Sequence, residues 1–394
     1  MTATLDRPTT TTDLACTISQ GALKEALTTV LRTVSDKRVI PIISNVKLTV
    51  TDSSLDLATT NLESAYMIRL PLMGGQPGSF TVPARLLADF VSTLPNAPVS
   101  LRMVDGVLKV ESGRSKASIK GIDPDDFPTM PEPTGEPTAE LDRDTLRTAL
   151  GLTVIAVAKD EQRPVLAGVH MADGVSFVVE AADGVRLARY ASYGEADTAK
   201  WDVLIPADGV RELLKLCDAD QHTIPLWLLP NADNPAHVVA KVGTDDAYTI
   251  FGVRLLAGTF PDLARIIPKS SITSVTVSRA ALIAAVKQCT IFSAGDVKGF
   301  RLVTLVVSGE GDFGLLSLSA TEAQTGDGAS ELSVTVDGEA TTVMLNGPFV
   351  AECLSAMTGE SVVIGVNGPL SPLTLTDPET PDYTHVLMPM HTVA

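Results

Sequence analysis

Three times along the chain, a short β-type run leads directly into a stretch whose apolar residues recur at helical spacing. In the middle copy the run WDVLIP ends at Pro206, and the apolar residues that follow fall at i, i+3, i+4 and i+7: Val210, Leu213, Leu214 and Cys217. This spacing predicts an amphipathic helix that packs one apolar stripe on a core. Arg211 and Lys215 are four residues apart, so they lie together on a different face of this helix.

The same unit occurs near the start and near the end of the chain. In FTVPARLLADFVSTLP, residues 80–95, the corresponding apolar positions are Leu86, Leu87, Phe90, Val91 and Leu94. In TVMLNGPFVAECLSAM, residues 342–357, they are Phe349, Val350, Cys353, Leu354 and Met357. Three copies of one strand-to-helix unit predict a protein built from three repeated domains.

Each copy belongs to a longer pattern of helices and strands that also repeats. We predict two helices per repeat, over residues 20–34 and 83–94, 142–158 and 206–217, and 278–292 and 346–357. Asp142 and Ser278 are predicted N-caps. Alternating apolar and polar positions between the helices predict antiparallel strands, with turns at Asp52-Ser53 and Asp105-Gly106. The predicted fold class is α+β, with two helices packed on antiparallel sheets in each repeat.

Proline-rich segments predict where one repeat ends and the next begins. Two repeats end on Phe-Pro, at Phe127-Pro128 and Phe260-Pro261, and the first is followed by the connector TMPEPTGEPT. The amino-terminal MTATLDRPTTTTD is rich in threonine and has no apolar segment, which indicates a disordered leader rather than a secretory signal. The predicted organisation is a leader (1–13) and three domains (14–134, 135–268 and 269–394).

Composition narrows the class of protein. The chain has 394 residues, 45% of them hydrophobic, which is enough for two or three domains with cores of their own. Its four cysteines are scattered without a CxxC pair, so we interpret them as small apolar residues in a reducing cytosol. No apolar run approaches the ~20 residues of a membrane helix. We expect a soluble cytoplasmic protein.

The sequence offers no constellation for catalysis. The five histidines show no HExxH or HxH spacing, and the phosphate-loop, GxGxxG and GxSxG motifs are absent. Acidic pairs such as Asp125-Asp126 and Asp245-Asp246 stand in turn-like contexts typical of solvated loops. We therefore predict no catalytic residue, no metal site and no cofactor, and favour a binding or scaffolding protein. A DNA-independent adaptor or enzyme built from three repeats is the alternative.

Positive charge is concentrated on the predicted helices. The net charge is -17, which taken alone argues against a basic nucleic-acid-binding surface. The six predicted helices nevertheless carry nine basic and seven acidic residues, so they are net positive. Either these helix faces are simply solvated, or they face a polyanion while the acidic remainder faces away. Contacts from lysine and arginine to phosphates would give binding that is independent of base sequence.

Several stretches resemble the bacterial DNA polymerase III β subunit family, the sliding clamps. The matching stretches are RVIPIISNVKLTV, FTVPARLLADFVSTLP, VESGRSKASIKGIDPDDFP, ADGVRLA, VLIPADGVRELLKL, GTFPDLARIIP and VLMPM, spread over residues 14 to 390. The resemblance implies three clamp domains and a head-to-tail homodimeric ring around double-stranded DNA, with the helices lining the hole. It implies as partners the replicative DNA polymerase, the clamp loader and other proteins with clamp-binding motifs, and a nucleoid-associated cytoplasmic location.

The resemblance also assigns roles to residues. It implies DNA contacts from Lys24, Arg32, Lys37, Arg85, Arg147, Lys159, Arg163, Arg211, Lys215 and Lys287. It implies a dimer interface in which a strand around Ala117 and Ile119 meets Ile291 and Phe292 of the other chain, with Arg114 and Lys116 near Glu322 and Glu331.

A partner-peptide pocket is implied between the second and third domains. Its residues would be Leu166, Ala182, Gly184, Val185, Arg186, Leu187, Pro261, Ile266, Asn346, Phe349, Leu370, Pro372, Val386, Met388, Pro389 and Met390. Ala182 and Val185 depart from the family pattern, which commonly has threonine and an aromatic residue or histidine there. The chain also continues past Met390 with HTVA. A divergent clamp, from a phage or a second gene copy, fits these departures as well as a main clamp does.

Overall fold

A computed structural model describes the chain from residue 14 to residue 390. The positions inside this span that stay undescribed are 36–39, 160–162, 175, 194–200, 231, 233–234, 294, 296–298, 323 and 325. The predicted leader, Lys37 and the terminal HTVA therefore lie outside the described residues. The described part forms six α-helices and 25 strands. None of its helices is long and apolar enough to cross a membrane.

Each of the six predicted helices is present and begins directly after a strand. The first helices of the repeats are α1 (Gln20–Val30), α3 (Arg143–Thr153) and α5 (Arg279–Thr290). The second helices are α2 (Ala84–Thr93), α4 (Ala207–Leu216) and α6 (Gly347–Ala356). They are shorter than predicted, partly because α1 and α3 tighten into the 3₁₀ turns η1 (Leu31–Thr33) and η4 (Val154–Ala156). Ser278 caps α5 as predicted, because its hydroxyl accepts a hydrogen bond from the Ala281 amide at 3.4 Å.

The helices bury one apolar stripe each, with one departure from the predicted pattern. In α4, Val210 and Leu213 are 0% and 1% exposed. In α2 the prediction is wrong at Leu86, which is 54% exposed. The buried face of α2 consists of Ala84, Leu87, Ala88 and Val91, and Leu86 falls beside that stripe on the helix. All four cysteines are buried, in agreement with their interpretation as small apolar residues.

Contacts divide the chain into two compact units, and the first unit contains two sheets. It comprises residues up to 143 together with 215–254. Its five-stranded sheet has the order β5 (Gly75–Gln76), β1 (Ala15–Ser19), β7 (Pro98–Val104), β8 (Val107–Ser112), β9 (Ser115–Lys120). Its eight-stranded sheet has the order β10 (Ala139–Asp142), β15 (Thr223–Leu229), β16 (His237–Gly243), β17 (Tyr248–Arg254), β4 (Ser64–Pro71), β3 (Ser54–Thr60), β2 (Asn45–Val50), β6 (Gly78–Pro83). Asp105 and Gly106 form the predicted hairpin turn between β7 and β8, both with positive φ (50° and 73°).

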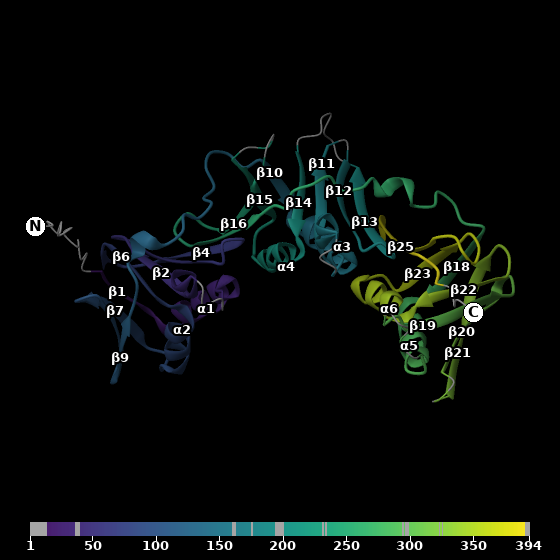
Figure 1. Cartoon of the computed structure of the whole chain (residues 1–394), viewed down its shortest axis with the longest axis horizontal. Coiled ribbons are helices and arrows are strands. Elements are labelled where there is room, and N and C mark those ends of the chain that lie inside the picture. Colours follow the sequence, from purple (N-terminus) through teal and green to yellow (C-terminus); the bar gives the residue numbers. More distant parts are fainter. Residues whose placement is uncertain are drawn as a thin grey trace, which may run out of the picture. The chain divides into compact units, whose positions relative to one another are not determined.

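The second unit is built on one long sheet. It comprises residues 144–214 and the chain from 255 onward. The twelve strands have the order β14 (Trp201–Pro206), β11 (Gly168–Asp173), β12 (Ser176–Ala182), β13 (Arg186–Tyr193), β25 (Thr380–Leu387), β24 (Leu373–Asp377), β23 (Ser361–Val366), β18 (Thr273–Ser278), β21 (Gly326–Asp337), β20 (Gly311–Glu322), β19 (Leu302–Ser308), β22 (Thr341–Asn346). All pairings within it are antiparallel, and Figure 1 shows β13 next to β25.

Two strand pairs join the sheets of successive repeats, and they share one design. In the first joint, within the first unit, β4 pairs with β17 and Tyr66 lies opposite Phe251. In the second joint, within the second unit, β13 pairs with β25 and Ala188 lies opposite His385. At one end of each joint, a backbone hydrogen bond links the end of the second strand to the turn that precedes the first strand. The Arg254 amide donates to the Glu63 carbonyl at 2.7 Å, and the Met388 amide donates to the Val185 carbonyl at 2.8 Å. The middle repeat therefore contributes one strand to each joint.

Candidate functional site

The turn between β12 and β13 is fixed by an aspartate and a glycine. Oδ1 of Asp183 accepts hydrogen bonds from the amides of Val185 and Arg186, at 2.9 Å each. Gly184 has a φ of +91°, a conformation that side-chain-bearing residues rarely adopt. The Asp-Gly sequence therefore determines this tight turn, which presents Val185 to the end of β25.

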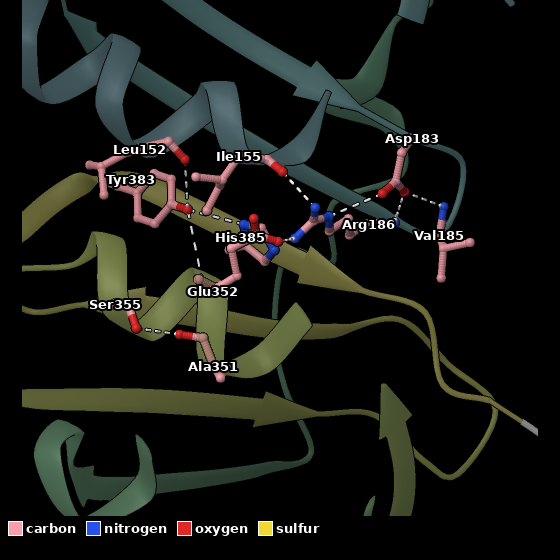
Figure 2. Close-up of polar contacts among 11 residues, drawn as sticks. Leu152, Ile155, Asp183, Val185, Arg186, Ala351, Glu352, Ser355, Tyr383 and His385 are labelled. Carbon is pink, nitrogen blue, oxygen red and sulfur yellow. Dashed lines mark hydrogen bonds and ion pairs between the residues drawn. The ribbon is translucent and has the colours of Figure 1, made fainter. Parts of the chain in front are cut away.

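Arg186 is buried below this turn with every polar contact satisfied by protein. Its side chain is 1% exposed, and its guanidinium donates to Asp183 Oδ2 at 3.0 Å and to Glu352 Oε2 at 2.7 Å. A third bond goes to the carbonyl of Ile155 in the middle of η4, and the guanidinium lies 4.0 Å from the centre of the Phe349 ring. Figure 2 shows Arg186 between the turn, η4 and α6. A buried cation held by two carboxylates is a fixed structural element rather than a free ligand.

Tyr383 and His385 extend this buried network along β25 (Figure 2). The Tyr383 hydroxyl donates to the Leu152 carbonyl at 3.2 Å and lies 3.0 Å from Nδ1 of His385. Burial, together with the nearby charge of Arg186, lowers the pKa of His385 to about 3. The ring is therefore neutral at physiological pH. If Nδ1 carries the proton and donates it to the tyrosine oxygen, the Nε2 that finds no partner among the described atoms is an acceptor.

A second polar row crosses the sheet at β14, β11, β12 and β13. His170 contacts two carboxylates, with Nδ1 at 3.0 Å from Glu180 Oε1 and Nε2 at 3.0 Å from Asp202 Oδ1. Glu180 also forms an ion pair with Arg189, and the His170 ring stacks on Phe260 at 5.0 Å between centres. Burial alone would lower the pKa of His170, but the bonds and charges of Glu180 and Asp202 outweigh it and raise that pKa. Sequence reasoning missed this row, because its members lie nine or more residues apart and no motif spacing connects them.

The residues predicted for the peptide pocket separate into a buried and an exposed set. The buried ones are Leu166, Ala182, Arg186, Leu187, Asn346, Val386 and Pro389. The exposed or half-buried ones are Gly184, Val185, Pro261, Ile266, Phe349, Leu370, Pro372, Met388 and Met390. One buried apolar cluster contains Ala182, Leu187, Val386 and Leu263. These side chains therefore support the surface from below and are not themselves exposed to a ligand. Ile266, Leu370 and Met388 are 48%, 65% and 38% exposed, which is unusual for large apolar side chains.

The residues predicted to contact DNA are exposed wherever they are described. They are Lys24, Arg32, Arg85, Arg147, Lys159, Arg163, Arg211, Lys215 and Lys287. Each α-helix except α6 carries at least one of them, and Arg211 forms an exposed ion pair with Asp208 at 2.7 Å. Lys37 lies outside the described residues. Exposure makes these cations available to a polyanion, but it is also what a solvated helix face requires.

The residues predicted for the dimer interface lie in two regions, one at β9 and one at β20, β21 and the end of α5. Lys116, Ala117 and Ile119 belong to β9, the last strand of the five-stranded sheet, and Arg114 is exposed just before it. Glu322 and Glu331 lie on β20 and β21.

A stretch of β21 is left with one strand neighbour among the described strands. β20 pairs along β21, whereas β18 reaches only Thr335–Asp337. At the end of α5, Ile291 is 75% exposed and Phe292 packs over Gly328 of β21, where a Cβ would be 2.3 Å from the ring. Phe292 thus covers the glycine from one face, and the strand edge beside it has no pairing partner among the described strands. β9 and the amino-terminal part of β21 are therefore two strand edges open to pairing.

Three family models match the chain along most of its length. They are the DNA polymerase III beta subunit N-terminal domain at residues 14–131, the central domain at 140–262 and the C-terminal domain at 264–391. They agree with the three repeats found in the sequence. The predicted boundaries at 134 and 268 stay predictions.

Similar proteins and structures agree with these matches. A beta sliding clamp of Pseudomonas putida is 29% identical over 378 residues, which cover 95% of this chain and 99% of that protein. The sliding clamp of Pseudomonas aeruginosa bound to griselimycin has a TM-score of 0.87 at 26% identity, covering 96% of this chain and all of that one. The Bacillus subtilis clamp has a TM-score of 0.87 at 21% identity and the same coverage, a likeness that concerns the fold alone.

Proposed function

Because the chain belongs to the DNA polymerase III beta subunit family, we propose that it is a non-catalytic sliding clamp, a ring of two copies that encircles duplex DNA and tethers a DNA polymerase. Its partners would be double-stranded DNA, the replicative polymerase, the clamp loader and other proteins that carry clamp-binding segments. The location would be the cytoplasm, at the nucleoid.

The observation that supports the ring most directly is the strand pairing that is repeated in the two joints. In the first joint, β4 of the first repeat pairs with β17 of the second repeat. In the second joint, β13 of the second repeat pairs in the same way with β25 of the third repeat. By their positions in the repeats, β21 corresponds to β4 and β13, and β9 corresponds to β17 and β25. Among the described strands of one copy, none pairs with β9 or β21 in this way, so β21 of one copy could pair with β9 of another. Two such head-to-tail contacts close a ring.

The two internal joints also predict the register of this third joint. In the hairpins that supply the first strand of each joint, Tyr66 pairs with Thr59 and Ala188 pairs with Ala181. The equivalent pair in the third repeat is Gly328 with Ala320. By the same comparison of β8–β9 with β16–β17 and β24–β25, Ala117 is the equivalent of Phe251 and His385. Gly328 should therefore lie opposite Ala117 of the partner subunit.

This register aligns opposite charges on the exposed face of the joint. Three residues further along each strand, Glu331 lies opposite Arg114 of the partner subunit. Asp327 lies between Lys116 and Lys120 of the partner subunit, because it is opposite Ser118 and side chains alternate along a strand. Acids on one edge and bases on the other favour pairing of two different edges over pairing of like edges.

Retention on DNA would then come from topology, with the exposed helix cations giving weak contacts that are independent of sequence. The test loads the protein onto a nicked circular plasmid with the clamp loader of the same cell and then linearises the plasmid. We expect retention on the circle, loss after linearisation, and retention on linear DNA whose two ends are blocked by bound protein. Equal retention on open linear DNA would refute the topological mechanism, and no retention on circles would favour the DNA-independent adaptor.

A further inference from the structure

The bond that holds the β12–β13 turn to α6 has no counterpart among the described contacts of the first joint. The turn of the first joint is built alike, because Asn61 Oδ1 accepts from the Glu63 and Ser64 amides at 3.0 and 2.7 Å. The residue equivalent to Arg186 is Ser64, whose hydroxyl donates back to Asn61 Oδ1 at 3.2 Å. In the second joint Arg186 instead reaches Glu352 on the second helix of the next repeat. The second joint thus has a connection that closing the sheet does not require.

A continuous series of bonds leads from Glu352 to Met388. Glu352 holds the guanidinium of Arg186, and the guanidinium holds Oδ2 of Asp183. The other oxygen of Asp183 fixes the amide of Val185, and the Val185 carbonyl accepts from the Met388 amide at 2.8 Å. Met388 is the exposed apolar side chain at the end of this series. These bonds therefore connect Glu352 to a position predicted to contact the partner peptide.

Glu352 itself lies outside the predicted peptide residues. Its side chain is 45% exposed, whereas that of Asp183 is 15% exposed and that of Arg186 is 1% exposed. It lines a shallow groove along α6 with Ile155, Lys287, Ala351, Ser355 and Ala356. Among the carboxylates that hold Arg186, Glu352 is therefore the one that can change without opening the buried cluster.

We propose that Glu352 is a positioning residue for the partner-peptide surface, and that it holds Met388 in place through Arg186 and Asp183. This proposal rests on the proposed function, because it concerns the surface that would receive the polymerase. It also explains why Arg186, although buried, is part of a surface that binds a partner: Arg186 positions the turn and does not touch the ligand.

The test measures binding of the purified catalytic subunit of the cell's replicative polymerase to the full-length clamp. Glu352→Gln keeps one acceptor oxygen and should weaken binding about threefold, whereas Glu352→Ala should weaken it about tenfold. Ser355→Ala is the matched control. Ser355 lies one turn away on α6, lines the same groove and bonds only to its own helix, at the Ala351 carbonyl (2.6 Å), so affinity should not change.

A double-mutant cycle separates positioning from general loosening. If Glu352 acts through Met388, Glu352→Ala should cost less than twofold in a Met388→Ala background, because the side chain that it positions is gone. Equal losses in both backgrounds, or no loss in the wild-type background, would overturn the proposal. Thermal melts confirm folding, and where Glu352→Ala melts early, Glu352→Gln carries the test. Absence of polymerase binding by the wild-type clamp would instead refute the proposed function.

Discussion

Reversal of one charge at the predicted third joint tests the ring and its register together. The perturbation is Arg114→Glu on the β9 edge, or Glu331→Arg on the β21 edge. An exposed ion pair contributes about 0.5 kcal/mol, and a like-charge pair costs a similar amount. Each reversal should therefore cost about 1 kcal/mol per joint. With two identical joints per ring the total is about 2 kcal/mol, or about 30-fold in the dimer dissociation constant.

Sedimentation equilibrium or mass photometry at nanomolar concentration measures this constant. The chain that carries both reversals restores opposite charges at the joint, so its dimer should be close to wild type in stability. Arg102→Glu is the matched control, because Arg102 is exposed on β7, two strands in from the β9 edge. Added salt should narrow the difference between the variants. If the double variant is weakened by the sum of the two single effects, Glu331 and Arg114 of the partner subunit are not opposite one another, and the inferred register is incorrect.

Two further predictions concern stability within each unit. His170→Gln should lower the melting temperature more at about pH 6 than at about pH 9. The pKa of His170 is raised in the folded state, so its contribution to stability is complete below the unfolded pKa of about 6.5 and is lost as the pH rises through the folded pKa. A difference in melting temperature that grows with pH would contradict the assigned contacts with Glu180 and Asp202. Phe251→Ala should lower the free energy of unfolding in urea by about 3–5 kcal/mol, since Phe251 is 0% exposed and its ring centre lies 4.9 Å from that of Tyr66. Leu86→Ala, at a half-exposed position, should change this free energy by less than about 0.5 kcal/mol. Equal effects of the two substitutions would mean that Phe251 is not part of the core of the first joint.

The local architecture could be predicted from the sequence because it depends on short-range periodicity. The strand-to-helix units and the Asp105-Gly106 hairpin follow from spacing and turn chemistry over fewer than twenty residues. Leu86 shows the limit of this reasoning. Apolar character and spacing do not define the edge of a stripe, which depends on where the facing sheet ends.

Long-range pairing could not be predicted in the same way. Nothing in the local pattern of β13 indicates that its partner is β25, about 200 residues away, because any amphipathic strand edge satisfies the same pattern. The burial of Arg186 is a second example. A lone arginine after an Asp-Gly turn indicates a solvated cation, and only the approach of α6 and η4 provides the acceptors that make burial possible.

The two internal joints differ where a partner peptide would be received. At the tip of the first joint's turn stands Leu62, with a φ of +77°, in the place that Gly184 occupies in the second joint. Leucine carries backbone strain in this conformation, whereas glycine adopts it without strain. In the first joint Pro131 also lies against Gly252, where a Cβ would be 2.8 Å from the proline ring.

The closing residues differ as well. The first joint ends on Arg254, a charged side chain, whereas the second ends on Met388, whose flexible apolar side chain can fit ligands of several shapes. The two joints thus share one strand pairing and differ in the side chains at the turn and at the closing bond. The second joint is also the one whose turn is anchored to α6 by Arg186 and Glu352. An adaptable apolar surface needs a rigid support to bind with useful affinity, because freedom in the protein would be lost on binding. Under the proposed function, the anchor and the Met388 side chain would therefore be two parts of one binding surface.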